Sequence, residues 1–243
     1  MLNPRVDPEA FVRAYAPILH FHPREGEQCC YPSDAEEIFA KYGSDWTQFK
    51  DDASPKTFQP DAPCYYEYWL DEDMFQIKYW FWYRYNDFPG PPLGRGKHRG
   101  DWEHVEVRHY PPRSETLCTI WLLSTHLKAL LVSYPGFCTL PGFTPEPISL
   151  TDKHVHVWVA LGSHANFPSP NGPKKRIALI WRDSTANGGE EWHTERSLKL
   201  IDDTNFANYV GRWGNRRSPR GPRNPYNSRT RNAPLVEPIP VNP

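Results

Sequence analysis

The chain has 243 residues, enough for one well-buried domain, and its composition does not change before the C-terminal tail. Lys and Arg number 28 against 29 Asp and Glu, so the overall charge indicates neither a nucleic acid nor an acidic partner. The 27 prolines interrupt the chain too often for long helices, whereas ten Trp and thirteen Tyr suit short strands and structured loops.

The N-terminal residues contain no apolar run of signal-peptide length, and no later run is long enough to span a membrane. We therefore expect an intracellular, cytoplasmic protein. The five cysteines include the adjacent pair Cys29 and Cys30 and do not follow the pattern of a disulfide framework, so buried free thiols are expected. A nucleophilic Cys–His pair at Cys118 or Cys138 has no local support in the sequence.

Two short helices are predicted before the first long strand. Apolar residues recur at helical spacing over 8–20, and Pro17 closes that pattern. A second helix is predicted over 33–42, with Ser33 as the N-cap and Glu36 completing a capping box.

Strand-like runs dominate the rest of the chain, each rich in aromatic or β-branched residues and bounded by Pro, Gly, Asn or Asp. The runs are 64–70, 73–85, 102–110, 117–125, 128–134, 154–161 and 177–182. They predict a mainly β fold, a single-domain β-sandwich with short peripheral helices. Segment 77–87 is aromatic on both faces, which favours a central strand covered on both sides over a platform that stacks on sugars.

The C-terminal segment changes character. Six arginines stand among Pro, Asn and Ser between residues 216 and 243, with no apolar periodicity. We therefore divide the chain into a metal-binding β-sandwich domain, 1–215, and an extended basic Pro-rich tail, 216–243, that is expected to wrap the domain. Contact with nucleic acid or anionic lipid is the alternative, but the mixed charge elsewhere gives no continuous track for nucleic acid.

The most informative segment is Lys97-His98-Arg99-Gly100-Asp101-Trp102-Glu103. In an extended chain Asp101 and Glu103 project to one face beside apolar residues, and two carboxylates held that close repel unless a cation or a proton lies between them. His98 can reach the same point across the flexible Gly100. The pattern predicts a metal site; the alternative is a solvated loop with a surface ion pair to Arg99.

Three further residues are candidates because they end strands where a site would lie. Asp87 follows the aromatic strand and is placed to add a third carboxylate, while His126 and His164 stand beside small residues at two other strand ends. The remaining strand histidines His109 and His193 are expected to be structural.

Four ordered motifs resemble the vacuolar protein sorting-associated protein sixty-two family. The motifs are 80–86, 98–105, 124–126 and 160–168, followed by Gly-Arg-Trp-Gly at 211–214, so the resemblance spans roughly residues 10–225.

The central motif is also similar to the Gly-His-Arg-His-Asp-Trp-Glu heptapeptide of the necrosis- and ethylene-inducing peptide-like proteins. These are β-sandwich cytolysins that hold a divalent cation and bind sphingolipid sugar headgroups on plant membranes. The resemblance implies metal ligands at His98, Asp101 and Glu103, with Asp87 nearest to a further upstream Asp. Two positions of the heptapeptide differ here and no secretion signal is expected, so the resemblance implies the metal site rather than the toxic activity.

The sequence thus predicts a divalent-metal-dependent hydrolase or lyase that acts on a small polar or carbohydrate-like substrate. Mg, Mn or Ca suits one imidazole with two or three carboxylates, and Zn or Fe becomes plausible if His126 or His164 joins. A cation with open positions acidifies its bound water. His164 or His126 is then the expected general acid or base, with Arg99 or Arg84 beside an anionic group of the substrate.

Two other functions stay open at this point. One is a non-catalytic, metal-dependent module that binds a glycan or a lipid headgroup, with aromatic rings stacking on the sugar and contact with membrane headgroups. The other is a trafficking adaptor in which the cation serves folding alone. The sequence does not predict the oligomeric state.

Overall fold

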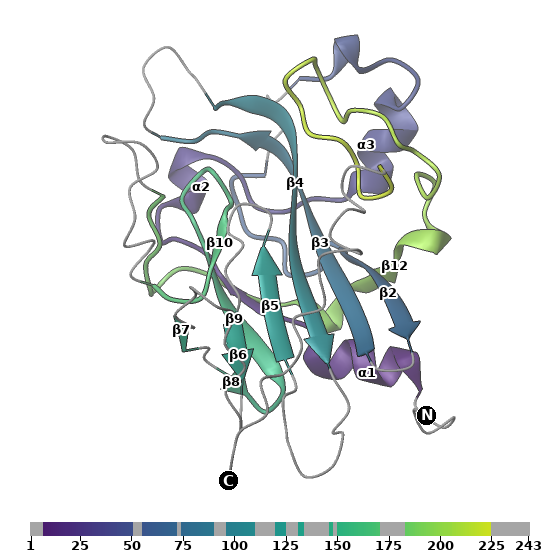
Figure 1. Ribbon diagram of the computed structural model, residues 1–243. Helices are drawn as coiled ribbons and strands as arrows, with labels where there is room; N and C mark the ends of the chain where they lie inside the picture. Colours follow the sequence, from purple (N-terminus) through teal and green to yellow (C-terminus); the bar gives the residue numbers. More distant parts are fainter. Residues whose placement is uncertain are drawn as a thin grey trace, which may run out of the picture.

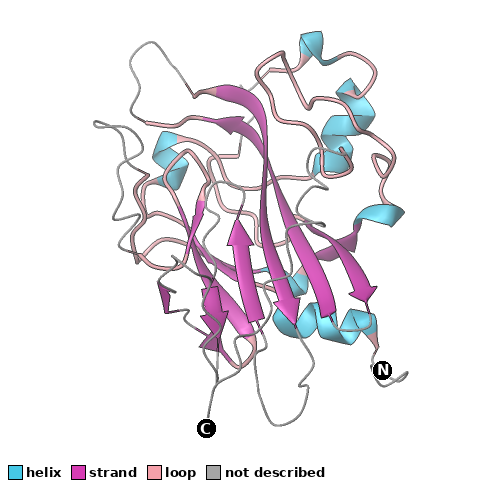
Figure 2. Ribbon diagram, in the orientation of Figure 1, coloured by secondary structure: helices cyan, strands magenta, loops and turns pink. Residues whose placement is uncertain are grey.

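The computed structural model describes residues 7–50, 55–71, 74–89, 96–109, 120–124, 131–133, 146–147, 150–170 and 183–224. Strands dominate this part of the chain and form two sheets, with short helices at their margins (Figures 1 and 2). The prediction of a mainly β sandwich with short peripheral helices is confirmed.

The described helices are all short. They are α1 (Pro8–Tyr15), α2 (Glu25–Gln28), α3 (Ala35–Tyr42) and the 3-10 turns η1 (Trp46–Gln48), η3 (Thr194–Arg196) and η4 (Ile201–Asp203). The helix predicted within 8–20 and closed by Pro17 ends at Tyr15. Because Pro17 forces the preceding residue out of the helical region, Ala16 is extended at φ −57° and ψ 133°, and the chain continues as strand β1 (Ile18–His20).

The N-cap of α3 also differs from the prediction. The Asp34 side chain accepts a 2.7 Å hydrogen bond from the Glu36 backbone N–H, so the cap lies one residue after Ser33. The buried Tyr65 hydroxyl donates to the same Asp34 oxygen at 2.7 Å. This second bond fixes the start of α3 on the sheet.

The larger sheet has the order β12-β2-β3-β4-β5-β6-β7. Its strands are β2 (Cys64–Asp71), β3 (Met74–Asn86), β4 (His98–His109), β5 (Ile120–Ser124), β6 (Leu131–Ser133), β7 (Glu146–Pro147) and β12 (Leu198–Leu200). Strand β4 begins at His98 rather than at Trp102, so the central motif from His98 onward is part of the sheet. The predicted run 177–182 lies outside the described residues.

The smaller sheet has the order β10-β9-β1-β11, with β8 also paired to β9. Its strands besides β1 are β8 (Leu150–Thr151), β9 (His154–Val159), β10 (Asn166–Phe167) and β11 (Glu191–His193). Strand β1 runs parallel to β9 and antiparallel to β11. The N-terminal segment therefore lies at the centre of this sheet.

Strand β3 is buried on both faces, which confirms its predicted central position. Tyr79, Phe81 and Tyr83 belong to the core between the sheets, whereas Trp80 and Trp82 pack into a second core beneath α3. In Figure 1, α3 and the yellow C-terminal segment lie side by side over this second core. At β3 the larger sheet is thus covered on both sides.

The C-terminal segment docks on the start of β4 through Trp213. The ring centroid of Trp213 lies 4.8 Å from that of Trp82 and 5.1 Å from that of Trp102. Gly100 has φ +64°, and a Cβ there would lie 2.0 Å from the Trp213 carbonyl oxygen, so only glycine fits this approach. Residues 225–243 lie outside the described chain, and wrapping by the tail stays a prediction.

No helix in the described ranges combines the length and the apolar character needed to cross a membrane.

Candidate metal-binding site

The central motif places two carboxylates between the sheets. In the antiparallel register of β3 and β4, Asp101 lies opposite Tyr83 and Glu103 opposite Phe81. Asp101 is 3% exposed and Glu103 is fully buried. Both carboxylates therefore stand on the inner face of the larger sheet, on the same side as Tyr83 and Phe81.

The smaller sheet contributes His164 from the tight loop between β9 and β10. The backbone N–H of His164 donates to the Ala160 carbonyl at 3.0 Å, and Ala160 N–H donates to the Ala165 carbonyl at 2.9 Å. His164 itself has φ +57°, a strained conformation for a residue with a Cβ. This strained conformation directs the imidazole into the space between the sheets.

The same loop is anchored to the end of β3. The Asp87 N–H donates to the Gly162 carbonyl at 2.8 Å. Gly162 has φ +65°, and a Cβ there would lie 2.6 Å from the Asp87 carbonyl oxygen. The glycine thus allows the two sheets to meet beside the site.

His164 is held on both ring nitrogens. Its Nδ1 lies 2.9 Å from Asp101 Oδ2 and its Nε2 lies 3.5 Å from Glu25 Oε1. Its ring stacks on Tyr83, with centroids 3.8 Å apart and planes 1° apart. Burial lowers the pKa of His164, but the hydrogen bonds to Asp101 and Glu25 outweigh burial and raise that pKa to about 9. At neutral pH His164 is a buried imidazolium between two carboxylates.

Glu25, which supplies the second carboxylate, was not a candidate from the sequence. It is fully buried at the start of α2, and both of its oxygens lie 3.2 Å from the Gly162 N–H that donates to them. Its sequence neighbours Arg24 and Glu27 form an exposed ion pair, so nothing in the local pattern separates the buried acid from a solvated helix turn.

His98 lies on the solvent side of Asp101. Its Nδ1 lies 2.9 Å from the Gly100 carbonyl oxygen, which fixes the ring with Nδ1 as the donor. Its Nε2 lies 3.9 Å from Asp101 Oδ1. The other oxygen of Asp101 already accepts from His164 and, at 3.2 Å, from Asn86. Asp101 therefore presents one oxygen to His98, whose side chain is 20% exposed.

The charges of the buried carboxylates converge near the Tyr83 hydroxyl. Burial raises the pKa of Tyr83 well above its usual value, and Glu25, Glu103 and Asp101 raise it further. The Tyr83 hydroxyl has no hydrogen-bond partner among the described residues. Three buried carboxylates thus act on the Tyr83 hydroxyl, and the ring of His164 stacks on Tyr83.

Two other predicted residues are engaged nearby. The Asp87 carboxylate forms an ion pair with Lys97 and accepts a 2.9 Å hydrogen bond from Gln28. The Arg99 guanidinium donates to the Phe49 carbonyl at 2.8 Å. His126 lies outside the described residues.

The cysteine prediction needs correction. Cys29 and Cys30 form a disulfide rather than two free thiols. Both are buried at the end of α2, with sulfur atoms 3.2 and 3.0 Å from the Tyr85 carbonyl oxygen. The number and spacing of the cysteines do not exclude a disulfide between adjacent cysteines, because such a disulfide needs no partner elsewhere in the chain. Cys64 is a buried free thiol, as expected, and burial raises its pKa.

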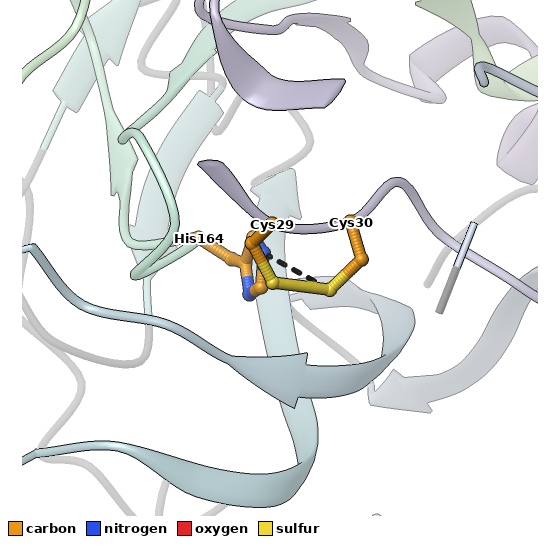
Figure 3. A group of neighbouring side chains, drawn as sticks. All are labelled: Cys29, Cys30 and His164. Carbon is orange, nitrogen blue, oxygen red and sulfur yellow. Dashed lines mark hydrogen bonds between the residues drawn. A yellow bond between two sulfur atoms is a disulfide. The ribbon is translucent and has the colours of Figure 1, made fainter. Parts of the chain in front are cut away.

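The disulfide lies beside His164, as Figure 3 shows. Cys30 Sγ is 4.0 Å from His164 Nε2. Within the described ranges, three potential metal-ligand atoms come within 4.8 Å of one another at Cys29, Cys30 and His164. Convergence of His98, Asp101, Glu103 and Asp87 on one ion stays a prediction.

Comparisons with known proteins give distant structural likenesses. No family model matches the chain, and no curated protein matches it in sequence. The fold is similar to that of the non-toxic HaNLP3 protein, at 14% identity and TM-score 0.44 over 84% of this chain and 80% of that one. It is similar to NLPPya in complex with mannosamine, at 13% identity and TM-score 0.43 over 84% and 78%. It is also similar to Necrosis and Ethylene inducing Protein 2 from the causal agent of cocoa's Witches Broom disease, at 15% identity and TM-score 0.41 over 81% of this chain and 74% of that one.

At such distances neither a ligand nor an activity transfers from those proteins. The resemblance to the vacuolar protein sorting-associated protein sixty-two family has no support from these comparisons and stays a prediction. Any function has to rest on this chain's own residues.

Proposed function

We propose that the chain is a divalent-cation-dependent binding module for a hydroxyl-rich polar ligand, such as a sugar or a sugar headgroup. One observation favours binding over catalysis. His164, the expected general acid or base, is fully buried and engaged on both ring nitrogens by Asp101 and Glu25. A proton carrier needs one nitrogen within reach of the substrate, and this imidazole instead joins the two sheets.

The proposed cation lies between His98 and Asp101. Their facing atoms are 3.9 Å apart, longer than a hydrogen bond. The separation is shorter than the sum of two metal–ligand bonds of about 2.0–2.5 Å each, so one ion can contact both atoms. The Gly100 carbonyl orients His98 and the His164 ring orients Asp101, each through a hydrogen bond. Metal-ligating groups are usually held by such hydrogen bonds. Glu103 and Asp87 are the further proposed ligands.

The ligand would enter from the side of His98. His98 is partly exposed, and Lys97, which is 35% exposed, forms an ion pair with Asp87 beside it. A cation with open positions takes neighbouring hydroxyl oxygens in place of water. The charged rim can then donate and accept hydrogen bonds around the same hydroxyls, so polar ligands are favoured over apolar ones.

The first experiment measures metal content and thermal unfolding with and without a chelator. An ion that binds only the folded state at a hundredfold excess over its Kd adds about 2.7 kcal/mol, or roughly 5–10 °C in Tm for a chain of this size. His98→Gln should lose the chelator-sensitive part of Tm. His193→Gln, which alters a 34% exposed histidine outside the site, should keep it. Equal chelator responses in the two variants would overturn the proposal.

The second experiment tests the ligand. Calorimetric titration with mannosamine and glucosamine, which occupy two of the similar structures, should give binding with the metal and none after chelation. Mass spectrometry of the recovered sugar separates binding from turnover. Chemical conversion that depends on His98 would contradict the binding module and restore the hydrolase or lyase.

A further inference from the structure

The Cys29–Cys30 pair lies next to a histidine that is already oriented as a metal ligand. The two sulfurs and His164 Nε2 all lie within 4.8 Å of one another, and the three residues are 3%, 0% and 0% exposed. Figure 3 shows the imidazole edge facing the sulfur atoms. The two cysteines play no part in the proposed site at His98, where His164 only orients the ligand Asp101.

The far side of His164 completes the arrangement. Its Nδ1 lies 2.9 Å from Asp101 Oδ2, so an N–H there donates to the carboxylate, while Nε2 lies 3.5 Å from Glu25 Oε1 and 4.0 Å from Cys30 Sγ. Metal-bound histidines are commonly held in this way, with the second nitrogen donating to a carboxylate that fixes the tautomer and strengthens the ligand. The strained φ of +57° at His164 keeps the ring in this position.

The spacing suits a thiolate site. Zinc bonds of about 2.3 Å to sulfur and about 2.0 Å to nitrogen, at a tetrahedral angle, place the two ligand atoms roughly 3.5 Å apart. Cys30 Sγ and His164 Nε2 are 4.0 Å apart, within a small side-chain adjustment of that value. Thiolate and imidazole together favour Zn²⁺ or Cu⁺ over Ca²⁺ or Mg²⁺.

We propose that Cys29, Cys30 and His164 form a second metal site, specific for a thiophilic ion such as Zn²⁺, that exists only after the Cys29–Cys30 disulfide is reduced. A thiol or phosphine reductant supplies two electrons to the S–S bond, and two protons complete the cysteine thiols. A thiol reductant leaves as its disulfide and supplies the two protons, whereas a phosphine leaves as its oxide, with the oxygen and both protons coming from water. Binding of the ion then releases both thiol protons and the Nε2 proton, and it withdraws Nε2 from Glu25.

The test compares oxidised and reduced protein in the absence of oxygen. After reduction with a phosphine and removal of the reductant, the protein should bind one more equivalent of Zn²⁺ than the oxidised form. Co²⁺ in place of zinc should give a sulfur-to-metal charge-transfer absorption only in the reduced protein. This comparison needs no substitution, so it does not depend on how a variant folds.

Variants then assign the site. Cys29→Ser with Cys30→Ser should abolish the extra equivalent and the absorption, while Cys64→Ala, which removes another buried thiol, should leave both unchanged. His98→Gln should lose metal from the oxidised protein and keep the extra equivalent after reduction, so failure of the first site is distinguishable from failure of this one. Equal zinc content in both redox states, or charge transfer that survives the double serine variant, overturns the proposal.

Discussion

Raising the pH should destabilise the protein by removing the charge of His164. The pKa of this group is about 9 in the folded chain against 6.5 for a free histidine. Because the folded state holds the proton more tightly, the stabilisation is fully present below pH 6.5, declines as pH rises, and is gone above pH 9. The difference between the two pKa values corresponds to about 3 kcal/mol of unfolding free energy.

Urea unfolding followed by tryptophan fluorescence measures this free energy. The series runs at intervals from about pH 6 to about pH 9.5, with a chelator present so that no bound ion contributes. His164→Asn is the matched control, because Asn tolerates a left-handed backbone and does not titrate. The advantage of the wild type over this variant should shrink by about 3 kcal/mol across the series, since other titrating groups cancel in the difference.

Two results would refute this account. One is a constant difference between wild type and His164→Asn at every pH. The other is an NMR titration in which the imidazole of wild-type His164 loses its proton near pH 6.5, because that value leaves no net stabilisation of the charged form by Asp101 and Glu25. The NMR measurement uses the wild type alone and does not depend on the variant's stability.

Three further predictions concern packing and buried charge. Gly100→Ala should lower the free energy of unfolding in urea by about 3 kcal/mol, because the new side chain both strains the backbone and overlaps Trp213. Gly188→Ala, at φ +89° with open space around it, should cost about 1 kcal/mol through backbone strain alone. Equal costs in the two variants would contradict the overlap with Trp213. Lys78→Met should lower the free energy of unfolding by about 3–5 kcal/mol, because it removes the ammonium that lies 3.9 Å from the buried Glu106 carboxylate. The double variant with Glu106→Gln should recover much of that stability, and additive losses would argue against pairing. Tyr83→Phe should change stability by less than about 1 kcal/mol in chelator, because the hydroxyl has no hydrogen-bond partner among the described residues, and a larger loss would reveal a bond to another group.

The parts of the fold that were predictable depend on local periodicity. The alternation after Asp101 puts Val105 in the core between the sheets and Trp102 in the core beneath α3. Two-sided aromatic content similarly marked β3 as a covered central strand. These patterns extend over many residues, so the side chains themselves record which face is buried.

The short elements are too short to show such a periodic pattern. Strands β1 and β11 have three residues each. Strand β1 forms because it pairs with β9, and β11 forms because it pairs with the other edge of β1. The cap at Asp34 depends on the Tyr65 hydroxyl, which comes from a strand far along the chain. Glu25 likewise becomes a buried acid through the Gly162 N–H. Each of these features is decided by a distant contact, which no local pattern contains.

The surroundings of His164 could not be predicted from its place in the sequence. Its place at a strand end, after Gly162 and Ser163, suggested a reactive group open to substrate. In the structure the imidazole is fully buried beside Asp101 and Glu25, which stabilise its cationic form, and a role as general acid or base stays a prediction. Those carboxylates come from α2 and β4, whereas His164 follows β9 of the other sheet, so the charge triad forms only when the two sheets pack. An ion bound by Asp101 or by the reduced cysteines therefore acts on a contact that also holds the sandwich together, and ligand affinity and fold stability should change together in variants of these residues.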